Sequence, residues 1–222
     1  MREMKQKEFK SILFRLATWK AERHLTLEGQ VKGLLPNLLE ELTELNRAQS
    51  VEEEIDALCD MVVFVLNALP HTELVNGSKI DDLDLDGRNI PHLVLDGSRP
   101  FPDPLKLPRM ILTALEQNSE PFYINLVEVL LRQIDAKGYD PYLCMCETLK
   151  EIESRLGRWD DCLHKFIKSE GYYTREEVKQ AYSFDTIKEY SDRFEIFQSL
   201  DDTAPYVVVK WYKAQYENCR YK

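Results

Sequence analysis

Acidic side chains recur at helical spacing in two neighbouring segments, and carboxylates in such a pattern can bind a divalent cation. On a helix, the three acids of the first segment fall within an arc of about 100°. The three acids of the second segment fall within about 60° by the same geometry. The six residues are Glu40, Glu41 and Glu44 in the first segment, and Glu53, Asp56 and Asp60 in the second.

Asp60 interrupts the apolar stretch ALCDMVVFVLNAL at residues 57–69, so we expect its carboxylate to be buried. An isolated buried carboxylate costs several kcal/mol unless it is paired, protonated or bound to a metal ion. Clusters of Asp and Glu without histidine suit Mg²⁺ or Mn²⁺ better than zinc or copper. We therefore predict a metal-ligand role for Asp60. The alternatives are a solvated helix face for Glu40 and Asp56, and a helix-capping role alone for Glu53.

Other metal sites fit the sequence less well. A di-iron carboxylate site needs Glu-x-x-His on two helices, and none of the four histidines completes that motif. The stretch DDLDLDG begins like a calcium-binding EF-hand loop, but Leu93 stands where the bidentate Glu is required. Cys144 and Cys146 have no matching second pair for a zinc site. An acidic surface loop is the simpler interpretation of DDLDLDG.

The two acidic segments require two helices that lie side by side. A capping box, SVEE, indicates a helix start at Ser50, with Glu53 at the third helical position. The short turn Ala48–Gln49–Ser50 makes the helices before and after it antiparallel neighbours. Pro36 within the first of these helices predicts a kink or a break.

Apolar spacing predicts an all-α fold over most of the chain. We expect a first helix along the stripe from Phe9 to Lys20. Further helices are expected at about 27–48, 51–69, 105–117, 122–137, 141–156 and 174–198, then a tail with a strand and a clasp. We interpret the chain as a single elaborated domain. Its parts are a metal-binding helical core (1–70), an insertion loop rich in Asp, Gly and Pro (71–104), the remaining core helices (105–170) and a C-terminal extension (171–222).

Composition limits the partners and the compartment. The 222 residues carry a formal net charge of −10 without a face dense in Lys or Arg, which argues against duplex nucleic acid as a partner. The longest apolar run is too short to cross a bilayer. The odd number of cysteines and the charged N-terminal segment, which lacks the apolar core of a signal peptide, favour a reduced, cytoplasmic protein.

The segment LLEELTELNRA followed by EIDALCDMVVFVLNAL resembles the MazG-like superfamily of all-α nucleoside triphosphate pyrophosphohydrolases, which includes the dimeric dUTPases. The family pattern is EExxE on one helix and ExxD on the next. The first half is intact here, whereas the second reads DALCD, similar to phage-type members. Aligning Glu53-x-x-Asp56 instead would restore the letters but leave Asp60 without a role.

The resemblance implies a Mg²⁺-dependent enzyme, with Mn²⁺ as a possible substitute, that cleaves a nucleoside triphosphate to a monophosphate and pyrophosphate. The implied metal ligands are Glu41, Glu44, Asp56 and Asp60. Glu40 or Glu53 is the implied group that activates water. The implied phosphate contacts are Lys150, Arg155, Lys165 and Lys168.

The resemblance further implies a homodimer or homotetramer that cleans a deoxynucleotide pool, with dUTP or dCTP as a plausible substrate. Phosphoribosyl-ATP pyrophosphohydrolase is a less suitable relative, because that enzyme lacks a long insertion and a large C-terminal half. A different class of function also remains open. The helices could form a non-enzymatic interaction or scaffold protein in which the acidic stripe is a degenerate metal site.

Overall fold

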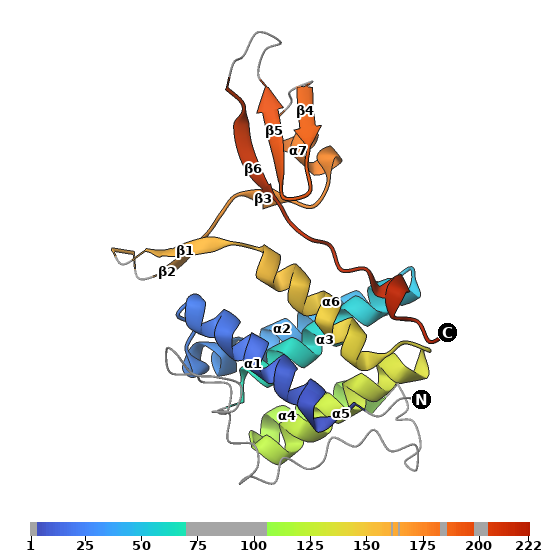
Figure 1. Cartoon of the computed structure of the whole chain (residues 1–222). Helices are drawn as coiled ribbons and strands as arrows, with labels where there is room; N and C mark the ends of the chain where they lie inside the picture. Colours follow the sequence, from blue (N-terminus) through green and yellow to red (C-terminus); the bar gives the residue numbers. More distant parts are fainter. Residues whose placement is uncertain (1–3, 70–105, 161, 164, 183–185, 198–203) are drawn as a thin grey trace. The chain divides into compact units, whose positions relative to one another are not determined.

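The computed structural model describes residues 4–69, 106–160, 162–163, 165–182, 186–197 and 204–222 (Figure 1). These residues form seven α-helices, six β-strands in two sheets and a short 3₁₀ helix, η4 (Tyr216–Cys219). The all-α prediction is therefore wrong. The chain divides into two compact units, which we call the first unit (Met1–Leu149 with Gln215–Lys222) and the second unit (Lys150–Ala214).

Six long helices begin in the first unit. The first contains the predicted stripe from Phe9 to Lys20, and the other five begin and end within two residues of their predicted bounds. They are α1 (Gln6–Glu22), α2 (Leu27–Arg47), α3 (Val51–Asn67), α4 (Leu107–Gln117), α5 (Glu120–Ala136) and α6 (Pro141–Ser154). The division between the two units falls within α6, after Leu149. The insertion predicted at 71–104 lies outside the described residues.

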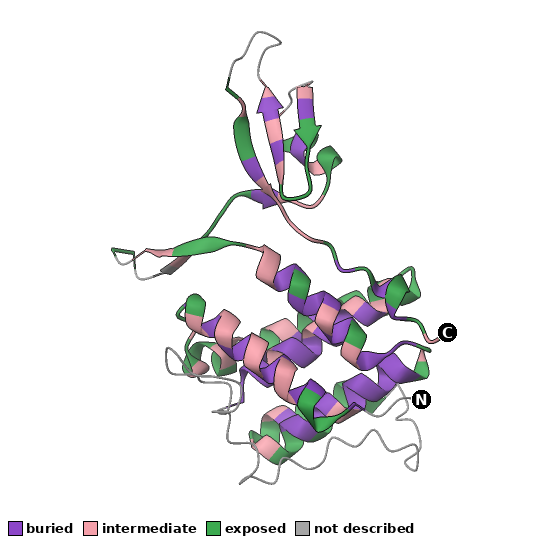
Figure 2. Ribbon diagram, viewed as in Figure 1, coloured by how far each residue is buried: buried purple, intermediate pink, exposed green. Residues whose placement is uncertain are grey.

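Helix α3 is the central element of the first unit, because it packs against α1, α2, α5 and η4. Apolar side chains occupy nearly its whole circumference and are buried, as its colouring in Figure 2 shows. A helix that is apolar over most of its circumference must be covered on most of its sides. Its position therefore follows from its composition.

Helix α2 has a single buried stripe, formed by Leu34, Leu38 and Glu41. Pro36 lies inside the helix, yet α2 continues from Leu27 to Arg47, so the predicted break does not occur. Both Pro36 and Lys32, whose carbonyl loses its helical partner, lie on the exposed side of α2. Water can hydrate that carbonyl there, which reduces the penalty of an internal proline.

The second unit contains both sheets. Strands β1 (Gly157–Asp160) and β2 (Lys165–Lys168) form an antiparallel pair. The other sheet has the order β3–β6–β5–β4, with a parallel β3–β6 pair and antiparallel pairs elsewhere. Its strands are β3 (Gly171–Tyr172), β4 (Thr186–Glu189), β5 (Arg193–Phe197) and β6 (Tyr206–Lys210), with α7 (Arg175–Tyr182) between β3 and β4.

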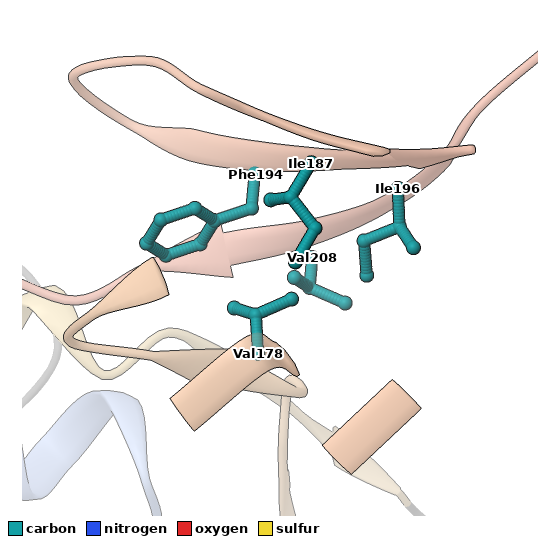
Figure 3. Packing of buried hydrophobic residues seen from close by; sticks show 5 residues of the cluster. All are labelled: Val178, Ile187, Phe194, Ile196 and Val208. Carbon is teal, nitrogen blue, oxygen red and sulfur yellow. The ribbon is translucent and has the colours of Figure 1, made fainter. Parts of the chain in front are cut away.

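The second unit has its own apolar core, in which one side chain of α7 meets four from the sheet (Figure 3). Phe194 of β5 lies opposite Val208 of β6, and both are buried. The prediction of a helix over 174–198 is correct only for α7, because β4 and β5 lie in the later described part of that range. Strands β1 and β2 lie between two predicted helices, where a loop containing Lys165 and Lys168 was expected. The five core residues are Val178, Ile187, Phe194, Ile196 and Val208.

The C-terminal tail returns to the first unit, which confirms the predicted strand followed by a clasp. After β6, the tail forms η4 and an isolated β-bridge between Tyr139 and Arg220. The Asp140 amide donates to the Cys219 carbonyl at 2.8 Å, and the Tyr221 hydroxyl donates to Asp135 at 2.6 Å. These bonds hold the last residues of the chain against the end of α5.

Candidate metal centre

Helices α2 and α3 pack against each other and are joined by only three residues, as the sequence predicted. Ser50 is the N-cap of α3, since its hydroxyl accepts a hydrogen bond from the Glu53 amide at 3.1 Å. The Glu53 carboxylate in turn accepts a hydrogen bond from the Gln49 amide at 2.5 Å, one residue before the position expected for a capping box. This capping fixes the first turn of α3 and therefore the level at which its acids face α2.

Glu41 is the buried member of the acidic cluster, with only 8% of its surface exposed. Its Oε2 atom has no hydrogen-bond partner among the described residues. Burial is the largest of several effects that raise the Glu41 pKa from 4.5 to about 8. The other effects are the negative charges of the remaining acids of this cluster, namely Asp60, Glu44, Asp56 and Glu40.

Four of the other five predicted acids therefore lie close enough to Glu41 for their charges to act on its carboxyl. At neutral pH the Glu41 carboxyl holds its proton, because its pKa of about 8 lies above that pH. A bound divalent cation would reverse this preference, since it neutralises the repulsion and gives the unpartnered oxygen a ligand. The all-oxygen donor set fits Mg²⁺ or Mn²⁺. In the part of the chain that the structure describes, however, no three potential ligands already converge as a metal-binding group.

Asp60 differs from the expectation, because its side chain is half-buried rather than buried, although Cys59 and Met61 on either side of it are fully buried. Asp56 is also half-buried. Glu40 and Glu44 are exposed on α2. The cluster therefore has one buried carboxyl, that of Glu41, and water can reach the other predicted ligands, Glu44, Asp56 and Asp60.

Tyr216 of η4 is a member of this site that the sequence analysis missed. Its hydroxyl donates a hydrogen bond to Asp56 Oδ1 at 2.7 Å and lies 2.9 Å from the Thr148 hydroxyl of α6. The contact orients one predicted ligand from a segment 160 positions away in the chain. No local spacing could have shown this pairing, because it depends on how the C-terminal tail folds back onto α3.

Glu53 combines its predicted role as a water-activating base with an observed role as a cap. The side chain is exposed, and one carboxylate oxygen is engaged by the Gln49 amide. Glu40 is exposed one residue before the buried Glu41 and contributes to the raised pKa of that group. Of these two candidate bases, Glu40 is therefore the one whose charge acts on the Glu41 carboxyl.

The predicted phosphate contacts belong to the second unit, whereas the acids belong to the first. Arg155 forms a salt bridge with Glu151 at 2.8 Å and donates to the Tyr173 hydroxyl at 2.8 Å. The Lys168 ammonium lies 3.9 Å from the centre of the Trp211 ring.

Burial and the nearby positive charge of Arg155 lower the pKa of Lys168. Within the second unit, these two cations therefore lie close enough to repel each other. Lys150 is exposed, and its ammonium lies 5.8 Å from the centre of the Tyr212 ring. The Lys165 side chain lies outside the described part of the structure.

Comparisons with known proteins neither support nor contradict the metal-centre interpretation, which rests on the structure alone. Searches against models of protein families, against curated proteins and against solved structures found no match to the chain. None of the described helices combines the length and the apolar character that a membrane span needs.

Proposed function

We propose that the protein is a metal-dependent nucleoside triphosphate pyrophosphohydrolase that releases a nucleoside monophosphate and pyrophosphate. The single observation that supports this proposal most is the buried Glu41 carboxyl, which has an unpartnered oxygen and is surrounded by four other acids. Such a cluster is unfavourable without a cation and becomes favourable when a cation binds. Glu41, Glu44, Asp56 and Asp60 are the residues that would hold Mg²⁺ or Mn²⁺.

The bound ion would supply charge neutralisation at the phosphates and a lower pKa for the attacking water. The chain's own residues supply the remaining requirements. Glu40 or Glu53 would accept the proton of that water, and both are exposed to solvent. Tyr216 would keep the Asp56 carboxylate in one orientation through its 2.7 Å hydrogen bond. Phosphate contacts by Lys150, Arg155, Lys165 and Lys168 remain part of the same proposal.

The first experiment measures pyrophosphate release from canonical and deoxynucleoside triphosphates, dUTP and dCTP included, in the presence of Mg²⁺. We expect EDTA, Asp60→Asn and Glu41→Gln each to abolish release. Glu28→Gln is the matched control, because Glu28 is an exposed acid in the first turn of the same helix as Glu41. Absence of release from every nucleotide by folded protein would reject the proposal, as would release that is insensitive to EDTA.

The proposed enzyme acts as a homodimer or homotetramer. Supporting this, α2 exposes a row of apolar side chains spaced four residues apart, formed by Val31, Leu35 and Leu39, with 39%, 44% and 46% of their surfaces exposed. Light scattering after gel filtration would test the assembly. Leu35→Asp should reduce the measured mass to that of one chain if this row is the interface, and an unchanged mass would exclude the row.

We place the enzyme in the cytoplasm, and the five cysteines, all of which are free thiols, support this part of the proposal. Nucleoside triphosphates to be cleaned from a pool are present in that compartment. Measurement of the free thiols in protein purified from cells under blocking conditions would test it. Oxidised pairs in that sample would contradict a reducing compartment.

A non-enzymatic scaffold is the second candidate. The observation that favours it is the lack of a converged ligand set among the described residues. In a scaffold, Asp60→Asn would change only the free energy of unfolding, and Mg²⁺ would leave that free energy unchanged. The two candidates therefore separate in one titration of thermal stability against Mg²⁺, with pyrophosphate release as the second readout.

A further inference from the structure

Helices α4 and α5 of the first unit line a hollow with a volume of about 330 Å³, within the lower range of small-molecule sites. Its floor is apolar, because Met110, Ala114 and Leu126 line it and the latter two are buried. These residues belong to neither the acidic cluster nor the core of the second unit. The hollow is therefore a separate feature of the first unit.

Two cations stand at the edge of this hollow. Lys106 precedes the first residue of α4, and Arg109 lies in its first turn, with both side chains exposed. The first turn of α4 contains no acid, and neither cation has an ion-pair partner among the residues that the structure describes. Cations at the positive end of a helix dipole are destabilising. A bound anion would remove that penalty and bridge the two groups.

Phe122 and Asn125 of α5 complete the lining, and both are exposed. Phe122 presents 38% of its surface, so an aromatic ring is available for stacking. Asn125 offers an amide that can donate and accept hydrogen bonds. Beside an apolar floor, these groups suit a flat ring that carries a few polar atoms.

We propose that the α4–α5 hollow binds a small organic anion with an aromatic body. Its ring would lie between Phe122 and the apolar floor, and its anionic group would contact Lys106 and Arg109. A partner helix with an apolar face would leave both cations without a counter-charge, so a single small anion fits the lining better. A polyanion such as nucleic acid would need a longer basic stripe, and the chain as a whole has a net charge of −10.

The test uses 8-anilinonaphthalene-1-sulfonate, an aromatic sulfonate with fluorescence that rises in apolar surroundings, with the full chain at neutral pH. We expect saturable binding at one site. The double variant K106Q/R109Q should weaken binding by about tenfold, which corresponds to losing one or two charge-assisted contacts. Lys179→Gln, which removes an exposed cation from α7, is the matched control and should bind like the parent protein.

A second variant, Thr113→Phe, separates the hollow from its charged edge, because Thr113 is a half-buried lining residue and a larger side chain there would fill the space. Loss of binding in both variants, with unchanged circular dichroism, supports the proposal. Unsaturable binding, equal binding by K106Q/R109Q, or undiminished binding by Thr113→Phe would each overturn it.

Competition then distinguishes two natural sources of the same chemistry. Displacement of the probe by nucleoside monophosphates indicates a nucleotide ligand, and displacement by indole-3-acetate alone indicates an aromatic carboxylate. Displacement by neither overturns the assignment of an aromatic anion. This inference does not rest on the proposed enzymatic function, because its readout needs neither Mg²⁺ nor hydrolysis.

Discussion

Glu41→Gln is the most informative substitution, because it removes an ionisable group while it keeps the size and shape of the side chain. In the folded chain the pKa of Glu41 is raised from 4.5 to about 8 by burial and then by the acids around it. Between these two values, the folded state therefore holds a proton that the unfolded state has released. Folding stability must fall as pH rises through this window, by up to about 1.4 kcal/mol per pH unit.

Over the whole window the loss would reach at most about 5 kcal/mol. Partly hydrated neighbours screen the charge, so we expect an observed loss of about 2–4 kcal/mol. Glutamine does not titrate, and Glu41→Gln should remove this loss. Relative to the parent protein, the variant should therefore gain stability as pH rises from 5 to 9.

Urea unfolding followed by far-ultraviolet circular dichroism at pH 5, 7 and 9, with EDTA present, measures this difference. Glu28→Gln on the same helix controls for the loss of a surface charge. Parallel stability profiles for the parent protein and Glu41→Gln would refute the assignment of Glu41 as the buried titrating group.

Adding Mg²⁺ at pH 8 extends the same experiment to the proposed metal centre. An ion at one hundred times its dissociation constant stabilises a folded protein by about 2.7 kcal/mol. The parent protein should show a gain of this kind, and Glu41→Gln should not. Equal stabilisation of both proteins would mean that the ion binds somewhere else.

Three further substitutions test other parts of the structure. Tyr216→Phe removes a hydroxyl that bonds to the acidic cluster and should lower the free energy of unfolding by about 1–3 kcal/mol, measured in urea. The hydrogen bond from the Tyr139 hydroxyl is the largest effect that lowers the pKa of Glu52 to about 2. The stabilising contribution of Glu52 is therefore present above pH 4.5 and is lost as pH falls towards 2. Glu52→Gln should lack this loss of stability when thermal unfolding is measured in acid. Gly171→Ala would place a methyl group 2.3 Å from Trp211 Nε1 and should lower the midpoint of tryptophan-detected unfolding.

Tyr216→Phe and Gly171→Ala each have a matched control. Tyr206→Phe removes an exposed tyrosine–carboxylate hydrogen bond and should change the free energy of unfolding by less than about 0.5 kcal/mol. Gly33→Ala in α2 meets its nearest atom at 3.5 Å and should be neutral or stabilising. An effect of Gly171→Ala no larger than that of Gly33→Ala would contradict the close packing of Trp211, and equal effects of the two tyrosine substitutions would contradict a special role for Tyr216.

Helices α1 to α6 could be predicted from the sequence because each carries its apolar spacing over at least eleven residues. The strands have two to five residues, so the same spacing gives little signal. In β5 the alternation was nevertheless present, since RFEIF places Phe194 and Ile196 on the buried face. β3 offered no such pattern, because its two residues pair with β6 from Val209 onward, far along the chain. The local spacing of apolar residues cannot predict a strand pairing between segments that are distant in sequence.

The candidate site was predictable to the extent that it depends on helical spacing. Acids on α2 and α3 influence the Glu41 carboxyl because a three-residue turn places the two helices side by side, and this proximity could be inferred from sequence. Tyr216 could not be inferred, since its contact with Asp56 depends on the path of the tail. The second unit was also missed as a sheet, and with it the hydrogen bond from Arg155 to the Tyr173 hydroxyl.

The acid that the fold buries is Glu41 rather than Asp60, and helix geometry explains why. Asp60 has buried neighbours in sequence, but neighbours in sequence point in different directions around a helix. Glu41 lies three and seven residues after Leu38 and Leu34, so it continues their stripe towards the core. Alignment with an apolar stripe therefore predicts the burial of a carboxylate better than apolar flanking residues do. The same geometry makes Glu41, the carboxyl with the unpartnered oxygen, the residue where a cation would change the folding free energy most.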